Sequence, residues 1–455
     1  METASVPTRQ SPPSAGAGAE RQPRELRRAI TGKLLFLFIL GDVLGAGIYA
    51  LTGEIAGETG GAIWAPMLAA LVLALLTAGS YAELVTKYPQ AGGSAVFAER
   101  AYRSELVTFL VGFCMLAAGV VSAAGLAIAF SGEYLATFID VPTRVGAVLF
   151  LILVGIVNAR GIRESMGVNA AMTCIEVSGL ILVVVAAAVL LTDGGGEPDR
   201  VLEFSPDKGV IPAVFAGTLL AFYSFVGFET SANVAEEIRE PSKVYPKALF
   251  GAVLTAGAVY VLVGLASASS VPIGQLAEST GPLLTVVDAS PLEIPHKVFN
   301  LIALLAVANG ALLTMIMASR LTFGLARDGI LPRGLARVLP NRRTPWAAIL
   351  LTTAVAIALT FLGDLATLAE TVVLFLLFVF LSTNVAVLVL RRDRVDHPHF
   401  QVWAPVPVLG AISCLVLLTQ QDGGVWVRGL VLLALGGIIF VVSRRGSRSG
   451  ETEEV

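Results

Sequence analysis

Residues 41–58 read GDVLGAGIYALTGEIAGE, and the rest of the chain is interpreted from them. They lie in the first long apolar run and place Gly45, Ala46 and Gly47 in succession. Glycine has no Cβ atom, so a helix in a membrane can open at this point and offer backbone groups to a ligand. We interpret the stretch as one half of a binding site, which requires a second half elsewhere in the sequence.

The composition is that of a membrane protein. The chain has 455 residues, of which 55% are hydrophobic and 14% are charged, and its mean hydropathy is +0.80. A soluble protein of this size needs a more polar surface. The apolar runs are close to the ~20 residues that a helix needs to cross a bilayer, whereas barrel strands alternate over about 10 residues. The sequence therefore predicts an all-α polytopic membrane protein.

Twelve transmembrane helices are predicted from these runs. The first begins near Leu34, and one long stretch, 346–390, is divided at Gly363-Asp364 into 346–362 and 366–390. The other runs cover residues 62–86, 105–131, 143–158, 166–191, 210–234, 247–270, 297–323, 404–419 and 428–443. Residues 1–30 are rich in Pro, Ala, Ser and Arg, and we expect a disordered tail rather than a signal peptide.

The basic residues are distributed unevenly between the two sides that twelve spans define. The chain has 31 Lys and Arg residues. If the N-terminal tail is cytoplasmic, the basic residues on the outer side of the membrane are Arg144, Arg200, Lys208, Lys297 and Arg428. Basic residues concentrate on the cytoplasmic side of membrane proteins. The charges therefore predict a multi-pass protein of the cytoplasmic membrane with both termini inside.

The second half of the site is predicted in the sixth span. Residues 221–237 read AFYSFVGFETSANVAEE, in which Gly227, Ser224, Ser231 and Asn233 interrupt the apolar pattern. A helix break here would expose carbonyl oxygens. This span lies five after the first, and an odd offset implies that the second set of five spans is inverted relative to the first. The alternative is that the glycines only allow helices to pack closely.

Four motifs carry a resemblance to a known family. They are GAGIY in the first span, PQAGGS at 89–94, GFExxxxxAEExxxPxxxxP at 227–246 and SRLTFGLARDGILP at 319–332. In this order they are similar to the amino acid, polyamine and organocation (APC) transporter superfamily. The resemblance covers about residues 30–440. LGAGIYALTGE and the sixth span look closest to the cationic amino acid transporters and their bacterial relatives.

The resemblance implies a secondary active transporter that moves amino acids by alternating access, and not an enzyme. Its fold would be a 5+5 inverted repeat with broken helices 1 and 6, followed by two C-terminal helices. We therefore predict a transport core at 31–400, helices 11 and 12 at 401–445, and a cytoplasmic tail at 446–455.

The resemblance also assigns the substrate to the two breaks. The amides around Gly45, Ala46 and Gly47 would bind the substrate carboxylate at the positive end of the following half-helix. The carbonyl groups expected to face the substrate ammonium belong to Val43, Phe222, Tyr223, Ser224 and Val226.

Gating is expected beside the second break, at Gly227, Phe228 and Glu229. Glu229 would hold the unwound region or a gate. Phe222, Tyr223 or Phe228 would close over the substrate, and the alternative for each ring is ordinary packing.

Two acidic residues fall within predicted spans, where charges are costly and usually functional. Glu176 lies in the fifth span, at a position where some proton-coupled relatives have lysine, so lysine-based coupling does not carry over to this chain. A buried carboxylate can itself take up and release a proton. Asp42 precedes the first break and is expected to share a proton or hold a cation with Glu176. The alternative is that each carboxylate pairs with a backbone amide or a nearby base.

Other chemistries lack their motifs. The chain has no GxxxxGK[ST] sequence for a nucleotide and no GxSxG sequence for a serine nucleophile. His296, His397 and His399 form no HExxH motif, and the three cysteines lie in apolar runs, so no metal or cofactor is expected. The basic residues show no aromatic interleaving of the kind that binds nucleic acid.

The expected partners are an amino acid, the lipid bilayer, and either protons or a counter-substrate, with sodium as a further alternative. A passive channel or sensor on a transporter fold, and an integral membrane enzyme acting on a lipid or peptide, are the alternative functions. The resemblance suggests arginine, lysine or ornithine as cargo, and neutral amino acids remain open.

Overall fold

The computed structural model describes residues 30–90, 92–160, 166–206, 209–327, 331–339 and 344–451. The predicted N-terminal tail, apart from Ile30, and residues 452–455 of the predicted C-terminal tail lie outside these ranges. Within them the chain is helical, and its β-type pairing is limited to two isolated backbone bridges, Ile30 with Ile238 and Gly60 with Phe204.

The helices follow one another along most of the described chain. The α-helices are α1 (Gly32–Leu44), α2 (Ala46–Thr59), α3 (Trp64–Lys87), α4 (Gly93–Tyr102), α5 (Glu105–Phe130), α6 (Glu133–Ala136), α7 (Thr143–Ala159), α8 (Met166–Thr192), α9 (Val210–Ser224), α10 (Pro241–Ser270), α11 (Ile273–Glu278), α12 (Pro282–Asp288), α13 (His296–Arg327), α14 (Trp346–Leu359), α15 (Leu365–Leu390), α16 (Pro405–Thr419) and α17 (Gly423–Glu451). The 3-10 helices are η1 (Pro198–Leu202), η2 (Phe228–Glu237) and η3 (Arg333–Ala336).

Each predicted apolar run coincides with a helix, and the chain is a polytopic helical membrane protein. Among the described residues, seven segments are long and apolar enough to cross a membrane, or nine if the bent pairs α1–α2 and α16–α17 each count as one span. Helices α7 and α14 are shorter and also apolar. Helix lengths therefore leave the count of twelve spans and the inverted repeat as predictions.

The division of 346–390 into two helices is confirmed. Helix α14 ends at Leu359 and α15 begins at Leu365. The Asp364 carboxylate accepts a hydrogen bond from the Thr367 amide at 2.8 Å, which satisfies one of the free N–H groups at the start of α15.

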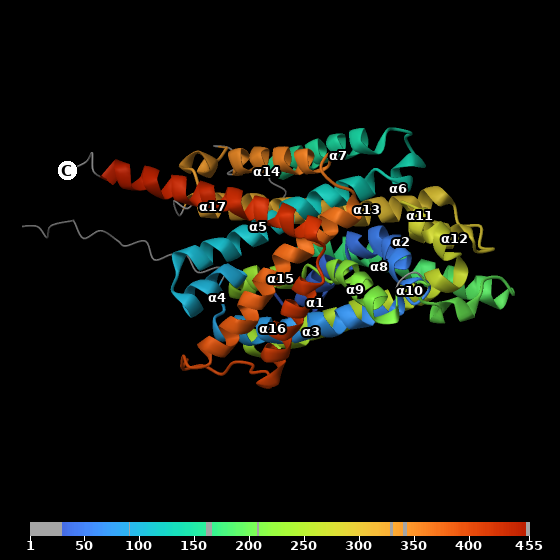
Figure 1. The fold of residues 1–455 in the computed structure, drawn as a ribbon, viewed down its shortest axis with the longest axis horizontal. Coiled ribbons are helices and arrows are strands. Elements are labelled where there is room, and N and C mark those ends of the chain that lie inside the picture. Colours follow the sequence, from blue (N-terminus) through green and yellow to red (C-terminus); the bar gives the residue numbers. More distant parts are fainter. Residues whose placement is uncertain are drawn as a thin grey trace, which may run out of the picture.

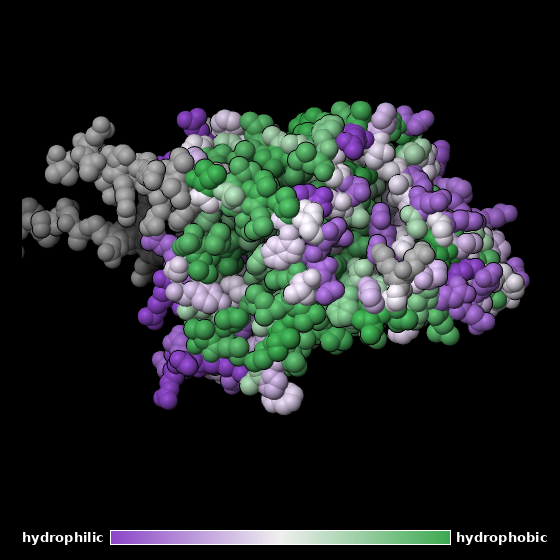
Figure 2. Space-filling model, in the orientation of Figure 1, coloured by the Kyte–Doolittle hydropathy of each residue, from purple (hydrophilic) through white to green (hydrophobic). Residues whose placement is uncertain are grey.

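Burial follows the position of each helix in the bundle. Helix α15 packs along α5 and is buried continuously from Thr371 to Leu377. On α7, which lies beside α14, Leu149 and Leu153 are 58% and 56% exposed (Figure 1). Leucine facing lipid carries no hydrophobic cost, because lipid tails are as apolar as the side chain. Hydrophobic residues cover much of the face shown in Figure 2, and hydrophilic residues gather toward its right end.

Two broken helical segments lie at the centre of the bundle. Helix α1 packs against α10 and α8, and α2 packs against α9 (Figure 1). The start of α1 is tied to the end of η2, because the Ile30 amide donates to the Glu237 carbonyl at 2.9 Å and the Arg239 amide donates to the Ile30 carbonyl at 3.1 Å. This arrangement brings the two glycine-rich stretches of the sequence together.

Candidate functional site

The first interruption lies between α1 and α2. Helix α1 ends at Leu44, Gly45 has φ −44° and ψ −155°, and α2 begins at Ala46. The first N–H groups of a helix have no partner within it, and the helix dipole makes this end positive. The start of α2 can therefore bind an anion such as a carboxylate. The side chain of Ala46 is outside the described part of the chain.

The second interruption lies between α9 and η2. Helix α9 ends at Ser224, and Gly227 has φ 128°, a conformation that favours glycine. The Glu229 carboxylate, 3% exposed, accepts a hydrogen bond from the Gly227 amide at 2.9 Å. Glu229 thereby satisfies a backbone donor that the break leaves free.

The two interruptions touch each other. A Cβ atom on Gly47 would lie 2.8 Å from Ser224 Cα, and one on Gly227 would lie 2.7 Å from the Asp42 carbonyl oxygen. Both distances are shorter than side chains tolerate, so each glycine allows a close backbone approach. The sequence interpreted these glycines as helix breaks, with packing as the alternative, and the structure gives them both roles.

Tyr260 of α10 joins the two interruptions and was not predicted. Its hydroxyl group is hydrogen bonded to the Val43 carbonyl and lies 2.8 Å from the Ser224 carbonyl oxygen. The ring is fully buried and packs edge-on against Phe225, with 5.0 Å between ring centroids. The available signal was a lone tyrosine within an apolar span, because a buried tyrosine hydroxyl needs a polar partner.

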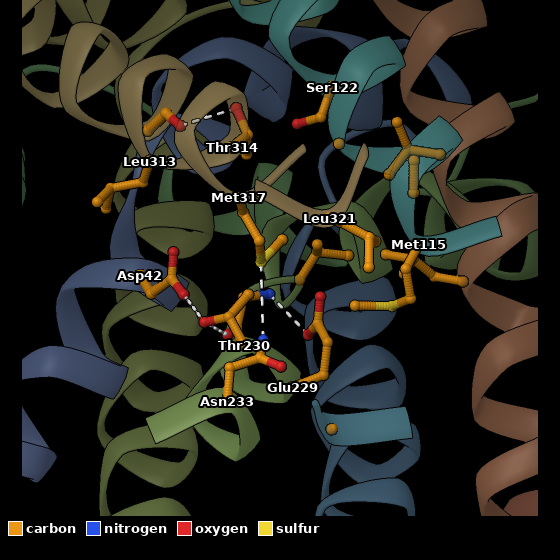
Figure 3. A pocket seen from close by; sticks show the side chains of 18 of the residues that line it. Asp42, Met115, Ser122, Glu229, Thr230, Asn233, Leu313, Thr314, Met317 and Leu321 are labelled. Carbon is orange, nitrogen blue, oxygen red and sulfur yellow. Dashed lines mark hydrogen bonds between the residues drawn. The ribbon is translucent and has the colours of Figure 1, made fainter. Parts of the chain in front are cut away.

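A cavity of about 490 Å³ opens at this junction. Its lining comes from α1, α2, α4, α5, α9, η2, α13 and α15, and includes Asp42, Ser122, Glu229, Thr230, Thr314 and Met317 (Figure 3). It is large enough to hold a small organic molecule.

Most of the predicted site residues line the cavity. These residues are Asp42, Val43, Gly45, Gly47, Tyr223, Ser224, Val226, Gly227 and Glu229. Several of the predicted carbonyl groups have partners in this conformation: Val226 N donates to Tyr223 O, and Phe225 N donates to Phe222 O, both at 3.1 Å. Their predicted contact with a ligand ammonium group remains a prediction.

Two predicted aromatic gates pack away from the cavity. Phe222 and Phe228 contact Phe380 of α15, with ring centroids 5.9 and 5.4 Å apart. Neither is among the described residues that line the cavity. Tyr223 does line it, and its hydroxyl group lies 2.8 Å from the hydroxyl of Ser122.

The two predicted coupling residues have different hydrogen-bond partners. The Asp42 carboxylate accepts a hydrogen bond from the Thr230 hydroxyl at the second break (Figure 3). Glu176, 1% exposed on α8, accepts one from the Asn309 amide of α13 at 3.1 Å. The Tyr49 hydroxyl donates to the backbone carbonyl of Glu176 at 2.7 Å, so the backbone of α8 at Glu176 is tied to α2 just after the first break. Thr230, Asn309 and Tyr49 were missed because their roles depend on contacts between distant spans.

A helical membrane protein with a cavity beside two touching helix breaks has the architecture of a transporter. The sequence pattern of the family described as "Amino acid permease" matches residues 31–435. This chain belongs to the amino acid permease family, within the APC superfamily, and is a transporter rather than an enzyme.

Curated relatives agree with this assignment. The chain is 28% identical to the branched-chain amino acid permease BcaP of Bacillus subtilis, over 93% of this chain and 95% of that protein. It is 27% identical to the methylthioribose transporter of the same organism, over 94% and 96%. It is 29% identical to the vacuolar cationic amino acid transporter 4 of Arabidopsis thaliana, over 81% of this chain and 64% of that protein.

Proposed function

We propose that the chain is a secondary active transporter that carries amino acids across the cytoplasmic membrane by alternating access. The observation that carries the proposal is the contact of two interrupted helices beside a cavity. An amino acid is a zwitterion, so it needs hydrogen-bond donors for its carboxylate and acceptors for its ammonium group. The start of α2 supplies amides, and the interrupted end of α9 supplies carbonyl groups.

The conformation is assigned to the inward-facing half of the cycle. The cavity lining includes Gly92, Asn233 and Arg320, which the distribution of basic residues assigns to the cytoplasmic ends of their elements. On the opposite side of the first break, the Tyr134 hydroxyl donates to the Tyr49 carbonyl at 2.8 Å. Both termini are then cytoplasmic, and transport requires the two interrupted segments to move so that the cavity opens outward.

Coupling to protons is proposed to run through Glu176. One of its carboxylate oxygens is bonded to Asn309, and the other, Oε2, is buried without a hydrogen-bond partner among the described residues. An unpaired buried oxygen favours the protonated carboxyl group over the carboxylate. The Glu176 carboxyl group is bonded to Asn309 of α13, and the Glu176 backbone carbonyl is bonded to Tyr49 of α2. A change in protonation would therefore alter the contact between α8 and α13 beside the first break. Exchange against a counter-substrate, or sodium coupling, is the competing mode.

The names of the relatives leave the cargo open. Those similar proteins are named for branched-chain amino acids, for methylthioribose and for cationic amino acids. Their sequence identities to this chain lie between 27% and 29%, so similarity does not favour one of these three cargoes over the others.

Uptake into proteoliposomes tests the proposal. The purified chain is expected to accumulate labelled amino acids when a pH gradient is imposed, with or without sodium. Saturable binding without accumulation under any gradient would indicate a channel or sensor and would contradict the transporter proposal.

The Glu176→Gln variant tests the coupling residue. It is expected to lose accumulation driven by the pH gradient and to retain exchange of labelled for unlabelled amino acid, because the amide cannot carry a proton. Glu370→Gln, which removes a half-buried carboxylate from α15, is the control and is expected to keep both activities. Full accumulation by Glu176→Gln would remove Glu176 from the mechanism.

A further inference from the structure

The wall of the cavity that faces the two breaks is mainly apolar. It is formed by α5, α13 and α15, and its side chains include Leu126, Val372 and Leu376. Figure 3 shows two further side chains of this wall, Met115 and Leu313. We infer that the cargo is an amino acid whose side chain is uncharged and mainly apolar, an inference that rests on the proposed function. The main chain of the cargo would lie at the breaks and its side chain would contact this wall.

Apart from Arg320, the polar side chains of the described wall that hydrogen bond are the hydroxyls of Ser122 and Thr314, and both have partners. Ser122 Oγ and Tyr223 Oη lie 2.8 Å apart. The Thr314 hydroxyl is 3.0 Å from the carbonyl oxygens of both Gly310 and Ala311 in its own helix. These hydroxyl groups can accommodate a small polar atom in the side chain of the cargo, and they carry no charge.

The carboxylates that line the cavity lie at the helix breaks and not on the apolar wall. Among the described lining residues, the charged ones are Asp42, Glu229 and Arg320. Asp42 is bonded to Thr230, and Glu229 is bonded to the Gly227 amide, so both carboxylates belong to the breaks. Arg320 extends the wall on α13 toward the cytoplasmic end, and its positive charge repels a cationic cargo.

This distribution of charge selects against lysine, arginine and ornithine. Burial of an apolar side chain against Leu313 or Leu376 is favourable in proportion to its area. Burial of an ammonium or guanidinium group without a counter-charge loses hydration and gains no ion pair in return. The resemblance to cationic transporters favoured such cargo, whereas the side chains of the cavity favour neutral cargo.

Competition measurements on the full-length protein test the inference. The probes are L-leucine, L-methionine, L-lysine and L-arginine, measured by calorimetry in detergent and by uptake into proteoliposomes. We expect the neutral amino acids to bind at least about 10-fold more tightly than the cationic ones. Equal or tighter binding of lysine or arginine would overturn the inference and leave the proposed amino acid transport intact. Binding of none of the amino acids would overturn the proposed function itself.

A matched pair of variants tests whether the missing negative charge on the wall is the reason for the selectivity. Ser122→Asp places a carboxylate on the wall, where the Tyr223 hydroxyl can donate to it, and Ser122→Asn has nearly the same shape without the charge. We expect the aspartate variant to bind lysine at least about 10-fold more tightly than the asparagine variant does. Equal lysine binding by two variants that still bind leucine would show that wall charge does not select the cargo. If neither variant folds, the measurements on the unmodified chain decide the inference.

Discussion

The hydroxyl group of Tyr260 lies between the carbonyl oxygens of Val43 and Ser224, which belong to the ends of α1 and α9. Both carbonyls are at interrupted helix ends, where the regular hydrogen bonds of a helix are missing. A single side chain from a third helix, α10, therefore sets the distance between the two halves of the proposed site. Side chains such as Tyr260 and Glu229 therefore hydrogen bond to the backbone groups that the helix breaks leave without helical partners.

Tyr260→Phe is expected to weaken amino acid binding while the protein still folds. The substitution retains the ring that packs on Phe225 and leaves the carbonyls of Val43 and Ser224 without their donor, a loss of about 1–2 kcal/mol, or roughly 10-fold in affinity. Tyr102→Phe is the matched control, because the Tyr102 hydroxyl donates to the Ser382 carbonyl at 2.7 Å and lies outside the cavity lining. Equal losses of binding in the two variants would contradict the role of Tyr260.

At the scale of elements, the C-terminal ends of α3 and α15 are joined by an ion pair. Arg391 donates to both oxygens of Glu83, from Nε at 2.8 Å and from Nη2 at 2.7 Å. The Val402 amide donates to Glu83 at 3.0 Å, and Arg391 donates to the Val402 carbonyl at 2.6 Å. The Glu83 side chain is 2% exposed, and that of Arg391 is 18% exposed. These contacts fix α3, α15 and the start of the segment before α16 as one unit.

Glu83→Gln is expected to destabilise this unit by about 3 kcal/mol, because removal of one partner leaves a mostly buried charge unpaired. Thermal unfolding in detergent measures the effect as a lower midpoint. The double variant Glu83→Gln/Arg391→Gln is expected to lose less stability than the sum of the losses in the two single variants, because the two side chains form one interaction. Strictly additive losses would show that the two side chains contribute independently.

At the scale of the whole molecule, the proposed transport cycle requires access to the cavity to change sides. The two interrupted segments lie within a surround of long helices, of which α3, α5 and α15 are extensively buried. Backbone breaks at Gly45 and Gly227 provide the places where the interrupted segments can change direction relative to that surround.

A cysteine at Asn233, an exposed residue of the cavity lining, is expected to react with a membrane-impermeant maleimide from the cytoplasmic side only. The background variant lacks Cys114, Cys174 and Cys414. Bound amino acid is expected to slow the reaction, because the cavity is then occupied. A cysteine at Leu202, which is 68% exposed, is the control and is expected to react from the outer side. Labelling of both positions from one side would contradict the proposed topology.

The sequence by itself determined that this is a helical membrane protein and where its long apolar helices lie. Hydrophobic runs of this length have one stable outcome in a bilayer, because a helix satisfies its own backbone hydrogen bonds. Gly45 and Gly227 indicated where helices are interrupted, because glycine lacks a Cβ atom and its backbone is less restricted. The motifs of the amino acid permease family lie on these same stretches.

Only the tertiary structure decided which groups complete the site. Tyr260 and Asn309 come from spans that the sequence reads as ordinary helices, and Thr230 lies beside the predicted second break. Their bonds to Val43, Glu176 and Asp42, respectively, each join positions more than 100 apart along the chain. Asp42 and Glu176 were predicted as a pair, and folding gave each a different hydrogen-bond partner; their shared role remains a prediction. The cargo wall is likewise a product of folding, because its selectivity follows from the absence of carboxylates where the described parts of three helices converge, and no single span carries that information.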